Sequence, residues 1–483
     1  MSTSAVRRPS SVARRPSSVV RRPTLAPTAL GLMLAAAASG CVLKNPPDAA
    51  AIKAESMPTV AVPDAWNRPA AAAGTVADNW LVTFNDVRLS EAITEALLHN
   101  ADLRVAVTRV EQARLYAKLA GARLWPSADL LARGGGKMSG DNSGLQGGVL
   151  SVSWELDLWG RVRYGRAAAA ADAAAAELDF EFARQSLAAL VARSWFLAIE
   201  AALQAEVARA ALRDNEGLVG LAQDRARIGV GNDEDVYIAR ANLGTSQDTL
   251  QQIELARENA IRALEILLGR YPSATATTGP LLPSPPEAVP AGLPSELLER
   301  RPDVVAAERR VAAAFNRIGE SKAARLPAIA LTSGVSNISS ELFVLQDRDN
   351  PIWSAGANLM MPIFRGGALK TQVEIRTAEQ KQAVAAYAQV GLQAFNEVES
   401  ALAAEFAARE REQILSRTLA DSQRALEIVR TQFKVGSTDL RFVTQRQLAL
   451  NATQSALVRV QTEQRIQRVN LHLALGGSFA QRQ

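Results

Sequence analysis

The sequence is poor in the residues that build metal sites, disulfides and catalytic triads. Its 483 residues include one cysteine, Cys41, and two histidines, His99 and His472. These side chains cannot form a His/Cys zinc cluster or a disulfide framework. A Ser-His-acid triad would need one of the two histidines, and both lie in helix-patterned stretches without a nucleophile motif such as G-x-S-x-G nearby. The sequence therefore predicts neither a metal site nor an enzyme, although counting residues leaves carboxylate-only catalysis open.

Most of the chain also lacks an excess of charge of either sign. The formal net charge is +5, but residues 1–40 hold six arginines and no acidic residue, so the rest has 48 basic and 49 acidic side chains. A nearly neutral body gives no support to nucleic-acid binding through bulk charge. The basic excess belongs to the amino-terminal segment alone.

Long apolar runs are the third absence. After residue 40 no run of about 18 uncharged apolar residues occurs, so the sequence predicts no membrane-spanning helix. Any crossing of a membrane would then require strands that close into a barrel. Residues 25–38 are apolar but too short to span a bilayer, and they have the size of a signal-peptide core.

The end of this apolar segment predicts a lipid anchor. Ala38, Ser39 and Gly40 precede Cys41, and this order resembles the lipobox of bacterial lipoproteins. The resemblance implies that Cys41 becomes the first mature residue and carries covalent diacylglycerol and N-acyl lipid. Val42 follows in place of an aspartate, which implies sorting to the outer membrane of a Gram-negative bacterium. An ordinary signal peptide with an incidental cysteine is the alternative.

The rest of the chain is built as two halves with one plan. Helix-patterned stretches at 101–124 and 302–326 each carry an acid in the first turn and end before a proline. Asp102 and Pro126 are 24 residues apart, and the equivalent acid and proline of the second half have the same spacing at an offset of 201. An acidic first turn and a proline just beyond the end are typical helix boundaries.

After each proline the apolar period changes from helical to alternating. Residues 150–158 place leucines, a valine and Trp154 on one face and serines and acids on the other, and residues 354–363 repeat this alternation. Weaker strands are expected at 127–133 and 328–335. Each half therefore contributes two strands.

Long helical stretches follow the strands in both halves. Residues 162–228 and 368–435 are 67 and 68 residues without proline, and as helices each would be ~100 Å long. Both reach glycine turns and return as helices at 233–268 and 439–475. We expect each returning helix to stack end to end with the preceding 24-residue helix, because their lengths together nearly match the long one. A crossing at 271–294 with seven prolines joins the halves and should lie outside the helical body.

Four strands per chain cannot close a barrel, because about eight is the practical minimum. Two copies would supply eight strands and fill the interior with side chains, whereas three copies would supply twelve and leave a lumen. A conducting barrel therefore favours a homotrimer. Four of the seven tryptophans lie in or beside the strands and suit an aromatic girdle at the lipid headgroups, with a soluble core as the alternative: Trp125, Trp154, Trp159 and Trp353.

These features resemble the TolC-like outer-membrane channels of tripartite efflux pumps, in their NodT-type lipoprotein branch. The resemblance is carried by WLVTFNDVRL at 80–89, NADL at 100–103, WELDLWGR at 154–161, RRPDV at 300–304 followed by AAE at 306–308, and VGSTDL at 435–440. It implies an α+β membrane protein with a trimeric 12-stranded β-barrel, four strands per protomer, continuous with a long periplasmic α-helical barrel.

The resemblance also implies an export function. The trimer would be the exit duct for drugs, metals or other small solutes, in outer-membrane lipid. Its partners would be a periplasmic adaptor of the membrane-fusion type and an inner-membrane transporter, of the RND type, with no nucleic acid and no cofactor beyond the lipid on Cys41.

The turns between the long and returning helices carry the candidate docking residues. Glycine suits turn conformations that are costly for other residues, and the resemblance implies that these turns form a periplasmic tip where an adaptor docks. The candidate turn and docking residues are Gly229, Gly231, Gly436, Ser437 and Thr438.

The polar residues after these turns have two interpretations. They satisfy the first turn of a helix, or in three copies they form a charged ring that narrows the tunnel mouth. The resemblance implies a gate acid about six residues after the glycine, which fits Asp235 in the first half, whereas Phe442 stands there in the second. The candidate ring consists of Asp233, Glu234, Asp235, Asp439 and Arg441.

The predicted organisation has six parts. They are a signal peptide (1–40), a lipid-tethered extended segment (41–80), a first repeat (81–269), a proline-rich crossing (270–294), a second repeat (295–476) and a tail (477–483). One alternative function is a periplasmic coiled-coil adaptor lipoprotein, which would need one hairpin and a lipoyl-like β domain. A lipoprotein enzyme is the other.

Overall fold

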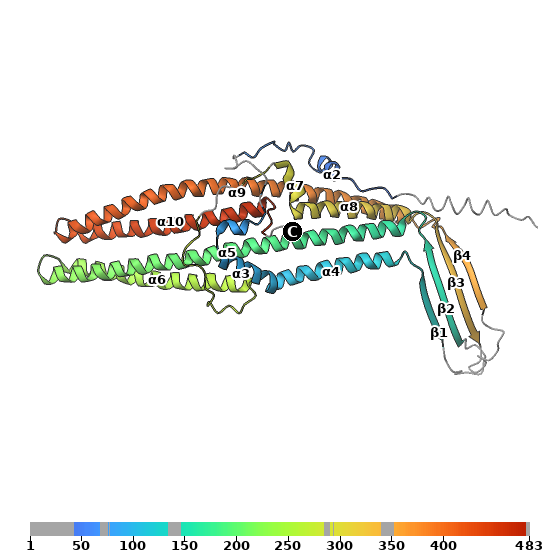
Figure 1. Ribbon diagram of the computed structural model, residues 1–483, viewed down its shortest axis with the longest axis horizontal. Coiled ribbons are helices and arrows are strands. Elements are labelled where there is room, and N and C mark those ends of the chain that lie inside the picture. The colour runs from blue at the N-terminus through green and yellow to red at the C-terminus, as the bar shows by residue number, and fades with distance from the viewer. Residues whose placement is uncertain are drawn as a thin grey trace, which may run out of the picture.

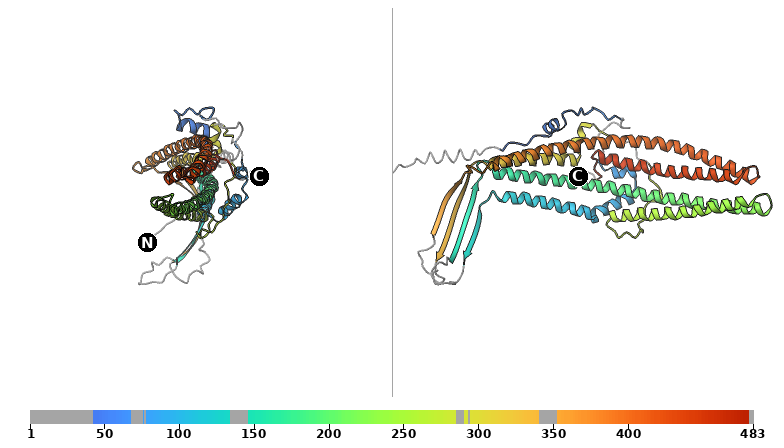
Figure 2. Two further views of the ribbon diagram at one scale, coloured as in Figure 1. Left: turned by 90° about the vertical axis from the view of Figure 1, so that its left-hand side faces the viewer. Right: turned by 180° about the vertical axis from the view of Figure 1, so that it is seen from behind.

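The computed structural model describes residues 43–67, 76, 78–133, 146–284, 290–292, 294–339 and 352–479. The predicted signal peptide and its Cys41 lie outside the described residues. The described part is elongated: a helical body ends in two hairpin tips on one side, and a four-stranded sheet leans away from its other end (Figure 1). Seen along the long axis, the helices form a curved wall and not a closed ring (Figure 2).

The two halves repeat each other in element order and in length. Each contains a 22-residue helix, two strands, a 67-residue helix and a 35-residue helix, which confirms the predicted repeat. The first set is α4 (Ala101–Ala122), α5 (Arg161–Arg227) and α6 (Asp233–Leu267), and the second is α8 (Pro302–Ala323), α9 (Ala368–Lys434) and α10 (Leu440–Ala474).

Local chemistry sets where these helices begin. The side chain of Asn100 accepts the backbone N–H of Leu103 at 3.1 Å at the start of α4. Pro302 occupies the first position of α8, where its missing N–H costs nothing. At the start of α5 the carboxylate of Asp157 accepts two backbone N–H groups, those of Val162 and Arg163, at 2.9 Å each.

The short and returning helices stack end to end beside the long ones, as expected. α4 and α6 lie along α5, and α8 and α10 lie along α9 (Figure 1). α5 also packs against α8 and α10 and so joins the two halves. Ion pairs between Asp172 and Arg317 and between Asp179 and Arg310 tie α5 to α8.

The middle of α5 is the most apolar helix segment of the described chain. By length and composition α5 is apolar enough to cross a membrane, although the sequence predicted no membrane-spanning helix. Half of its most apolar 18-residue stretch is buried inside the protein. Ala188, Val191, Phe196 and Ile199 of this region are fully buried in the core of the first half, so packing accounts for the hydropathy.

Two further helices precede α4 and lie beyond the predicted ranges. α3 (Val87–His99) packs on α5, and the carboxylate of Asp86 caps it through the N–H of Leu89 while accepting the indole N–H of Trp195, both at 3.0 Å. The segment 41–80 was expected to be extended, but it contains α2 (Ala49–Ser56). α2 lies against α9 and buries Ile52 completely, so contact with the second half determines its structure.

Short elements and a buried carboxylate hold the crossing. η1 (Trp80–Phe84) precedes α3, and η2 (Pro294–Glu296) and α7 (Leu297–Arg300) precede α8. Glu265, 1% exposed at the end of α6, accepts the backbone N–H groups of Ala274, Thr275 and Ala276 at 2.7–2.9 Å. The crossing then runs over the body towards α7 (Figure 1).

The strands form one antiparallel sheet in the order β1-β2-β3-β4. Their bounds are β1 (Ser127–Arg133), β2 (Gln146–Leu156), β3 (Ala328–Ser339) and β4 (Ile352–Met360). β1 agrees with the predicted range. β2, β3 and β4 extend further from the helices than predicted, whereas β2 and β4 end before the predicted residues 158 and 363. The alternation of apolar and polar residues is interrupted at Gly147, Gly148 and Asn337, so it did not predict strand there. The backbone hydrogen-bonded pairing of β2 with β3 nevertheless continues through these residues.

Candidate functional site

The sheet has one apolar and one polar face, and the register carries both faces across all four strands. Leu130 of β1 is opposite Leu150 of β2, which is opposite Val335 of β3, which in turn is opposite Trp353 of β4. Directly opposed residues lie on the same face of a sheet. The apolar face is formed by Ala128, Leu130, Leu150, Val152, Trp154, Leu156, Ile329, Leu331, Val335, Trp353, Ala355, Ala357 and Leu359, with Ser333 as a polar exception.

The opposite face carries mainly polar side chains. Its larger apolar residues are Leu131 and Val149, which pair with each other, and Ile352 and Met360 at the two ends of β4. The polar members are Ser127, Asp129, Ser151, Ser153, Glu155, Thr332, Ser336, Ser354 and Asn358. A sheet exposed to lipid on one side and to water on the other has this pattern.

Both outer edges of the sheet are unpaired in the described part of the chain. β1 and β4 each pair with one neighbour, so each presents a row of free backbone donors and acceptors. Such edges are stable in a membrane only when they pair with another strand. The sheet is therefore one part of a larger closed structure.

The four predicted girdle tryptophans lie at two levels of the sheet. Trp125, Trp154 and Trp159 stand near the helical end, and the indole N–H groups of Trp154 and Trp159 bind the carbonyls of Leu124 at 2.9 Å and Pro327 at 2.7 Å. Trp353 lies towards the other end, where β4 begins. The four side chains are 38–76% exposed, so a soluble core does not explain them in this chain.

Two of the three glycines at the hairpin tips have the backbone conformation that was expected to require glycine. Gly229 and Gly436 have φ of 78° and 81°, a left-handed conformation that favours glycine. Gly231 does not share it. A Cβ at Gly231 would instead lie 2.9 Å from Arg225 Cβ and 3.1 Å from the backbone of Ala226, so close approach of the chain explains this glycine.

Helix capping explains few of the acidic residues that follow the glycine turns. The residue that caps α6 is Asn232 and not one of the acids. Its side chain accepts the backbone N–H of Asp235 at 2.8 Å. Asp439 occupies the N-cap position of α10 but makes no side-chain capping hydrogen bond. Asp233, Glu234 and Asp235 stand in the first turn, where negative charge suits the helix dipole.

The two tips approach each other closely enough for their charges to interact. Partial burial, and then the negative charge of Asp439, raise the pKa of Asp235, while the positive charges of Arg225 and Arg441 act in the opposite direction. The structure thus brings candidates of the first tip beside candidates of the second. Ser437 closes the end of α9 through the carbonyl of Gln432 at 3.1 Å.

Arg225 links the two tips and was missed by the sequence analysis. Its guanidinium donates to the carbonyl of Phe433 at 2.6 Å and to that of Val230 at 3.1 Å, and it lies 4.6 Å from the centre of the Phe433 ring. Arg225 and Phe433 are 208 residues apart in sequence. An arginine in the last turn of a helix is expected simply because its positive charge suits the negative end of the helix dipole. No sequence signal therefore identified the contact of Arg225 with Phe433.

Replacing Arg225 should loosen the tips without unfolding the body. We expect Arg225→Met to speed hydrogen exchange at 225–232 and 431–438 about tenfold, because it removes a charged hydrogen bond and a cation–π contact between the tips. Arg227→Met is the matched control, since Arg227 pairs only with Asp224 on an exposed surface and should change exchange little. Equal exchange in the two variants would contradict the link.

The first described residues lie at the sheet end of the body. The backbone N–H of Lys44 donates to the hydroxyl of Tyr164 at 3.0 Å, and Leu43 fills the space beside Gly160 so closely that a Cβ there would meet it at 2.9 Å. Position 41 is two residues before Leu43. The described part of the chain therefore begins beside the start of α5, next to the sheet.

The chain is similar to known outer-membrane efflux proteins over most of its length. The family model of outer membrane efflux proteins matches residues 92–270 and 293–477. Cation efflux system protein CusC of Escherichia coli O6:H1 is 31% identical over 413 residues, 83% of this chain and 88% of CusC. The probable outer membrane lipoprotein SilC of Salmonella typhimurium is 29% identical over 411 residues, with the same two coverages of 83% and 88%.

A solved structure has a similar fold over most of this chain. The open state of the Neisseria gonorrhoeae MtrE outer membrane channel is 26% identical in sequence and has a TM-score of 0.75 to this chain. The match covers 91% of this chain and 98% of the MtrE chain.

Proposed function

Because this chain belongs to the outer membrane efflux protein family, we propose that its tips dock a periplasmic adaptor and that an RND-type inner-membrane transporter supplies its solutes. The chain is an outer-membrane efflux channel of a tripartite system. Three copies of the four-stranded sheet form a 12-stranded β-barrel, and their helices form the tube below it. The duct carries drugs or other small solutes out of the cell.

One observation carries the channel function. The apolar face runs in register over four strands whose outer edges are both free, at the end of helices that are ~100 Å long. In a closed barrel the apolar face contacts lipid and the polar face lines the lumen. The alternative of a coiled-coil adaptor would leave this two-faced sheet without a purpose.

The exposed surface of the tips supports adaptor docking there. Ile228, Val230, Val435 and Phe442 are 52–75% exposed beside the glycine turns. Exposed apolar side chains gathered at one place mark interaction surfaces. The small turn residues Gly229, Gly231, Gly436, Ser437 and Thr438 would let an adaptor hairpin come close to the backbone, and the apolar side chains would then be buried by it.

We further propose that the tip carboxylates narrow the tunnel mouth. Asp235 and Asp439 influence each other electrostatically within one protomer, and three protomers would bring six such carboxylates to the mouth. Asp233 and Glu234 are exposed and would extend the acidic surface, while Arg441 would offer a cation to a neighbouring acid. Such a ring favours passage of cations over anions.

Planar-bilayer recording on purified, heat-modifiable trimer tests the function. We expect stepwise conductance that prefers cations, and a weaker cation preference when Asp235→Asn is combined with Asp439→Asn. Asp421→Asn, an exposed acid on α9 in no described ion pair, is the control and should leave the selectivity unchanged. An inserted trimer without conductance would sink the channel function, whereas unchanged selectivity in the double variant would remove only the acidic ring.

We also propose that Cys41 carries the lipid anchor. Leu43 and Lys44 are held beside the start of α5, so an acyl chain two residues earlier would reach the membrane at the level where the apolar sheet face begins. The three acyl chains expected on Cys41 would by themselves give stable attachment. The closed barrel would hold the trimer in the membrane independently of them.

Removing the lipid should therefore weaken insertion without abolishing it. We expect Cys41→Ser, expressed behind a cleavable signal peptide, to leave a detectable fraction of trimer in outer-membrane preparations. Heat-modifiable migration on gels measures that fraction, and the wild-type chain behind its own signal is the reference. Complete loss of outer-membrane trimer would show that the barrel cannot insert without the lipid.

A further inference from the structure

The junction between sheet and helices is strongly basic. We define this junction as residues 118–126, 155–166, 320–328 and 360–370, which surround the four strand–helix connections. It contains nine basic and three acidic side chains, in a chain that is otherwise close to neutral. The basic residues are Lys118, Arg123, Arg161, Arg163, Arg166, Lys322, Arg325, Arg365 and Lys370, and the acids are Glu155, Asp157 and Glu320.

Two of the three acids are already neutralised inside the junction. Glu155 forms a bidentate pair with Arg161 at 2.6 and 3.0 Å. Asp157 pairs with Arg163 at 3.1 Å and also holds the first N–H groups of α5. Among the described residues, Arg166 and Arg365 form no ion pair, and both are exposed. Their charge is therefore available to an external anion.

Each of these two arginines lies beside a groove that contains a tryptophan. A groove of about 630 Å³ between α4 and α5 is lined by Trp125, Lys118 and Arg166 together with small residues. A second groove of about 340 Å³ is lined by Trp159 and Arg365, by the ion-paired side chains of Glu155, Asp157 and Arg161, and by apolar side chains from α8, β4 and the start of α9. Apolar surface next to a free guanidinium fits an amphipathic ligand.

Apolar side chains next to the arginines are unusually exposed. Ile363 and Phe364, which directly precede Arg365, are 91% and 87% exposed, and Trp125 is 76% exposed. Aromatic and apolar residues combined with Arg or Lys at the edge of a lipid-facing sheet are typical of the membrane–water interface. The junction thus occupies the level of the lipid headgroups on the helical side.

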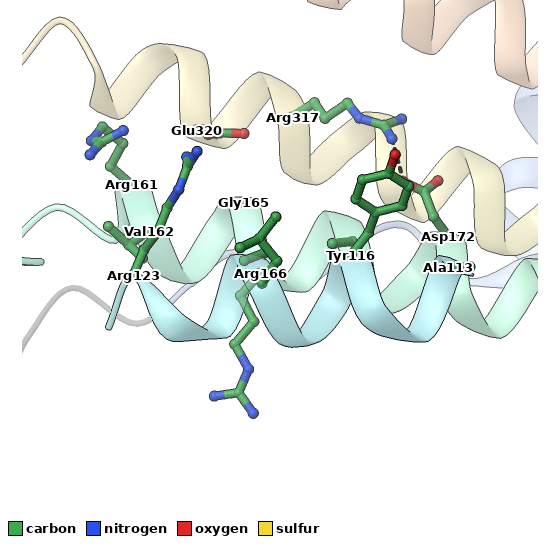
Figure 3. A pocket seen from close by; sticks show the side chains of 13 residues that line it. Ala113, Tyr116, Arg123, Arg161, Val162, Gly165, Arg166, Asp172, Arg317 and Glu320 are labelled. Carbon is green, nitrogen blue, oxygen red and sulfur yellow. Dashed lines mark hydrogen bonds and ion pairs between the residues drawn. The ribbon is translucent and has the colours of Figure 1, made fainter. Parts of the chain in front are cut away.

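A neighbouring cavity offers no comparable anion site. It measures about 410 Å³ and lies between α4, α5 and α8 (Figure 3). Its Arg317 is paired with Asp172, and Arg123 is directed towards Glu320 (Figure 3). Arg166 also lines this cavity, but its guanidinium points away from the other labelled side chains (Figure 3), and the same residue lines the groove between α4 and α5. The cavity therefore combines its arginines with the acids Asp172 and Glu320, whereas the groove between α4 and α5 contains Arg166 and no acid.

We propose that the two grooves bind acidic phospholipids of the periplasmic leaflet, with Arg166 and Arg365 contacting the phosphodiester headgroups. The planar guanidinium forks match phosphate oxygens, and Trp125 and Trp159 cover the glycerol and first acyl carbons. The proposal rests on the membrane position of the sheet. Three copies provide six grooves around the trimer, so the duct selects its surrounding lipid by charge.

Lipid retention on the purified full-length trimer tests this proposal. The trimer is reconstituted in vesicles of phosphatidylcholine with 20% phosphatidylglycerol, extracted in mild detergent, and its bound lipid measured by mass spectrometry. We expect phosphatidylglycerol to be enriched about fivefold over its share in the vesicle, the factor typical of a basic contact at a lipid surface. Arg166→Gln combined with Arg365→Gln should reduce the enrichment to about onefold.

Matched variants separate local binding from bulk charge. Arg213→Gln combined with Arg417→Gln removes two exposed arginines of the hairpins and should retain the enrichment, and Arg166→Lys with Arg365→Lys should retain most of it. No enrichment on the wild-type trimer, or equal loss in the hairpin control, overturns the proposal. Displacement by inorganic phosphate without preference for lipid would assign a free-anion site, and a variant that loses its trimer while the remaining trimer keeps its lipid would assign the arginines to the subunit interface.

Conductance measured on the same preparations distinguishes this proposal from the channel function. A conducting trimer with no acidic lipid removes the lipid sites alone. An inserted trimer that does not conduct removes the proposed function, whatever lipid it retains.

Discussion

Leu150→Arg should remove most of the trimer from the outer membrane. Leu150 lies near the middle of β2 on the apolar face, where it is opposite Leu130 and Val335. An arginine on the lipid face near the bilayer midplane costs roughly 2–4 kcal/mol, and the trimer would carry three of them. The amount of heat-modifiable trimer in outer-membrane fractions, compared with total protein, measures this effect.

The neighbouring residue provides the control. Ser151 is on the polar face, opposite Asp129, so Ser151→Arg would place its charge in the lumen beside an acid. We expect Ser151→Arg to assemble at close to the wild-type level and to change conductance instead. Equal loss of trimer in the two variants would contradict the assignment of the faces, because both introduce an arginine at neighbouring positions that lie on opposite faces.

Glu265→Gln should open the crossing between the halves. Glu265 is buried, and its carboxylate accepts three backbone N–H groups, those of Ala274, Thr275 and Ala276. An amide turns one of the two acceptor oxygens into a donor and removes the charge, so at least one buried N–H loses its partner. We expect local opening to become easier by about 3 kcal/mol, measured by hydrogen exchange of these three amides.

The same contact gives stability a dependence on pH. Burial alone would raise the pKa of Glu265, but the N–H donors and the Ser273 hydroxyl hold that pKa below its usual value. A carboxylate whose pKa is lowered in the folded state adds stability above its unfolded pKa of about 4.5, and this stability is lost as the pH falls through the folded pKa. The wild-type advantage over Glu265→Gln should therefore shrink when the thermal midpoints are compared at pH 7 and at pH 3.5.

A second glutamate of the same helix is the control for both measurements. Glu258 forms an exposed pair with Arg262 one turn away, so Glu258→Gln should change local opening by less than about 0.5 kcal/mol and show no comparable pH effect. If Glu258→Gln matched Glu265→Gln, the effect would come from the charge of α6 and not from the buried carboxylate.

His472 shows that amino-acid composition alone does not identify a catalytic residue. With two histidines in the sequence, His472 was one of the two imidazoles that a catalytic triad could use. In the fold it is 1% exposed and stacked on Trp80 at 5.7 Å, and burial, together with the charge of Arg468, lowers its pKa to about 3. It is therefore a neutral packing residue at physiological pH.

Local sequence determined the repeated elements of this protein. Prolines and acidic first turns set the ends of α4 and α8, and alternation placed Leu150, Val152, Trp154 and Leu156 on one face of β2. Period and breaker residues act within a few positions along the chain, so they can be read without the fold. For the same reason the family motifs and the turns at Gly229 and Gly436 were found from the sequence.

Only the tertiary structure decided which distant residues meet. It paired Arg225 with Phe433, gave the capping role to Asn232 in place of the acids beside it, folded α2 against α9, and gathered Arg166 and Arg365 at one level of the molecule. Each depends on packing between segments that lie far apart along the chain, and side-chain periodicity contains no information about that distance. The sequence by itself determined a duct of strands and long helices; the packing of one half on the other determined where its tips are joined and where its charge meets the membrane.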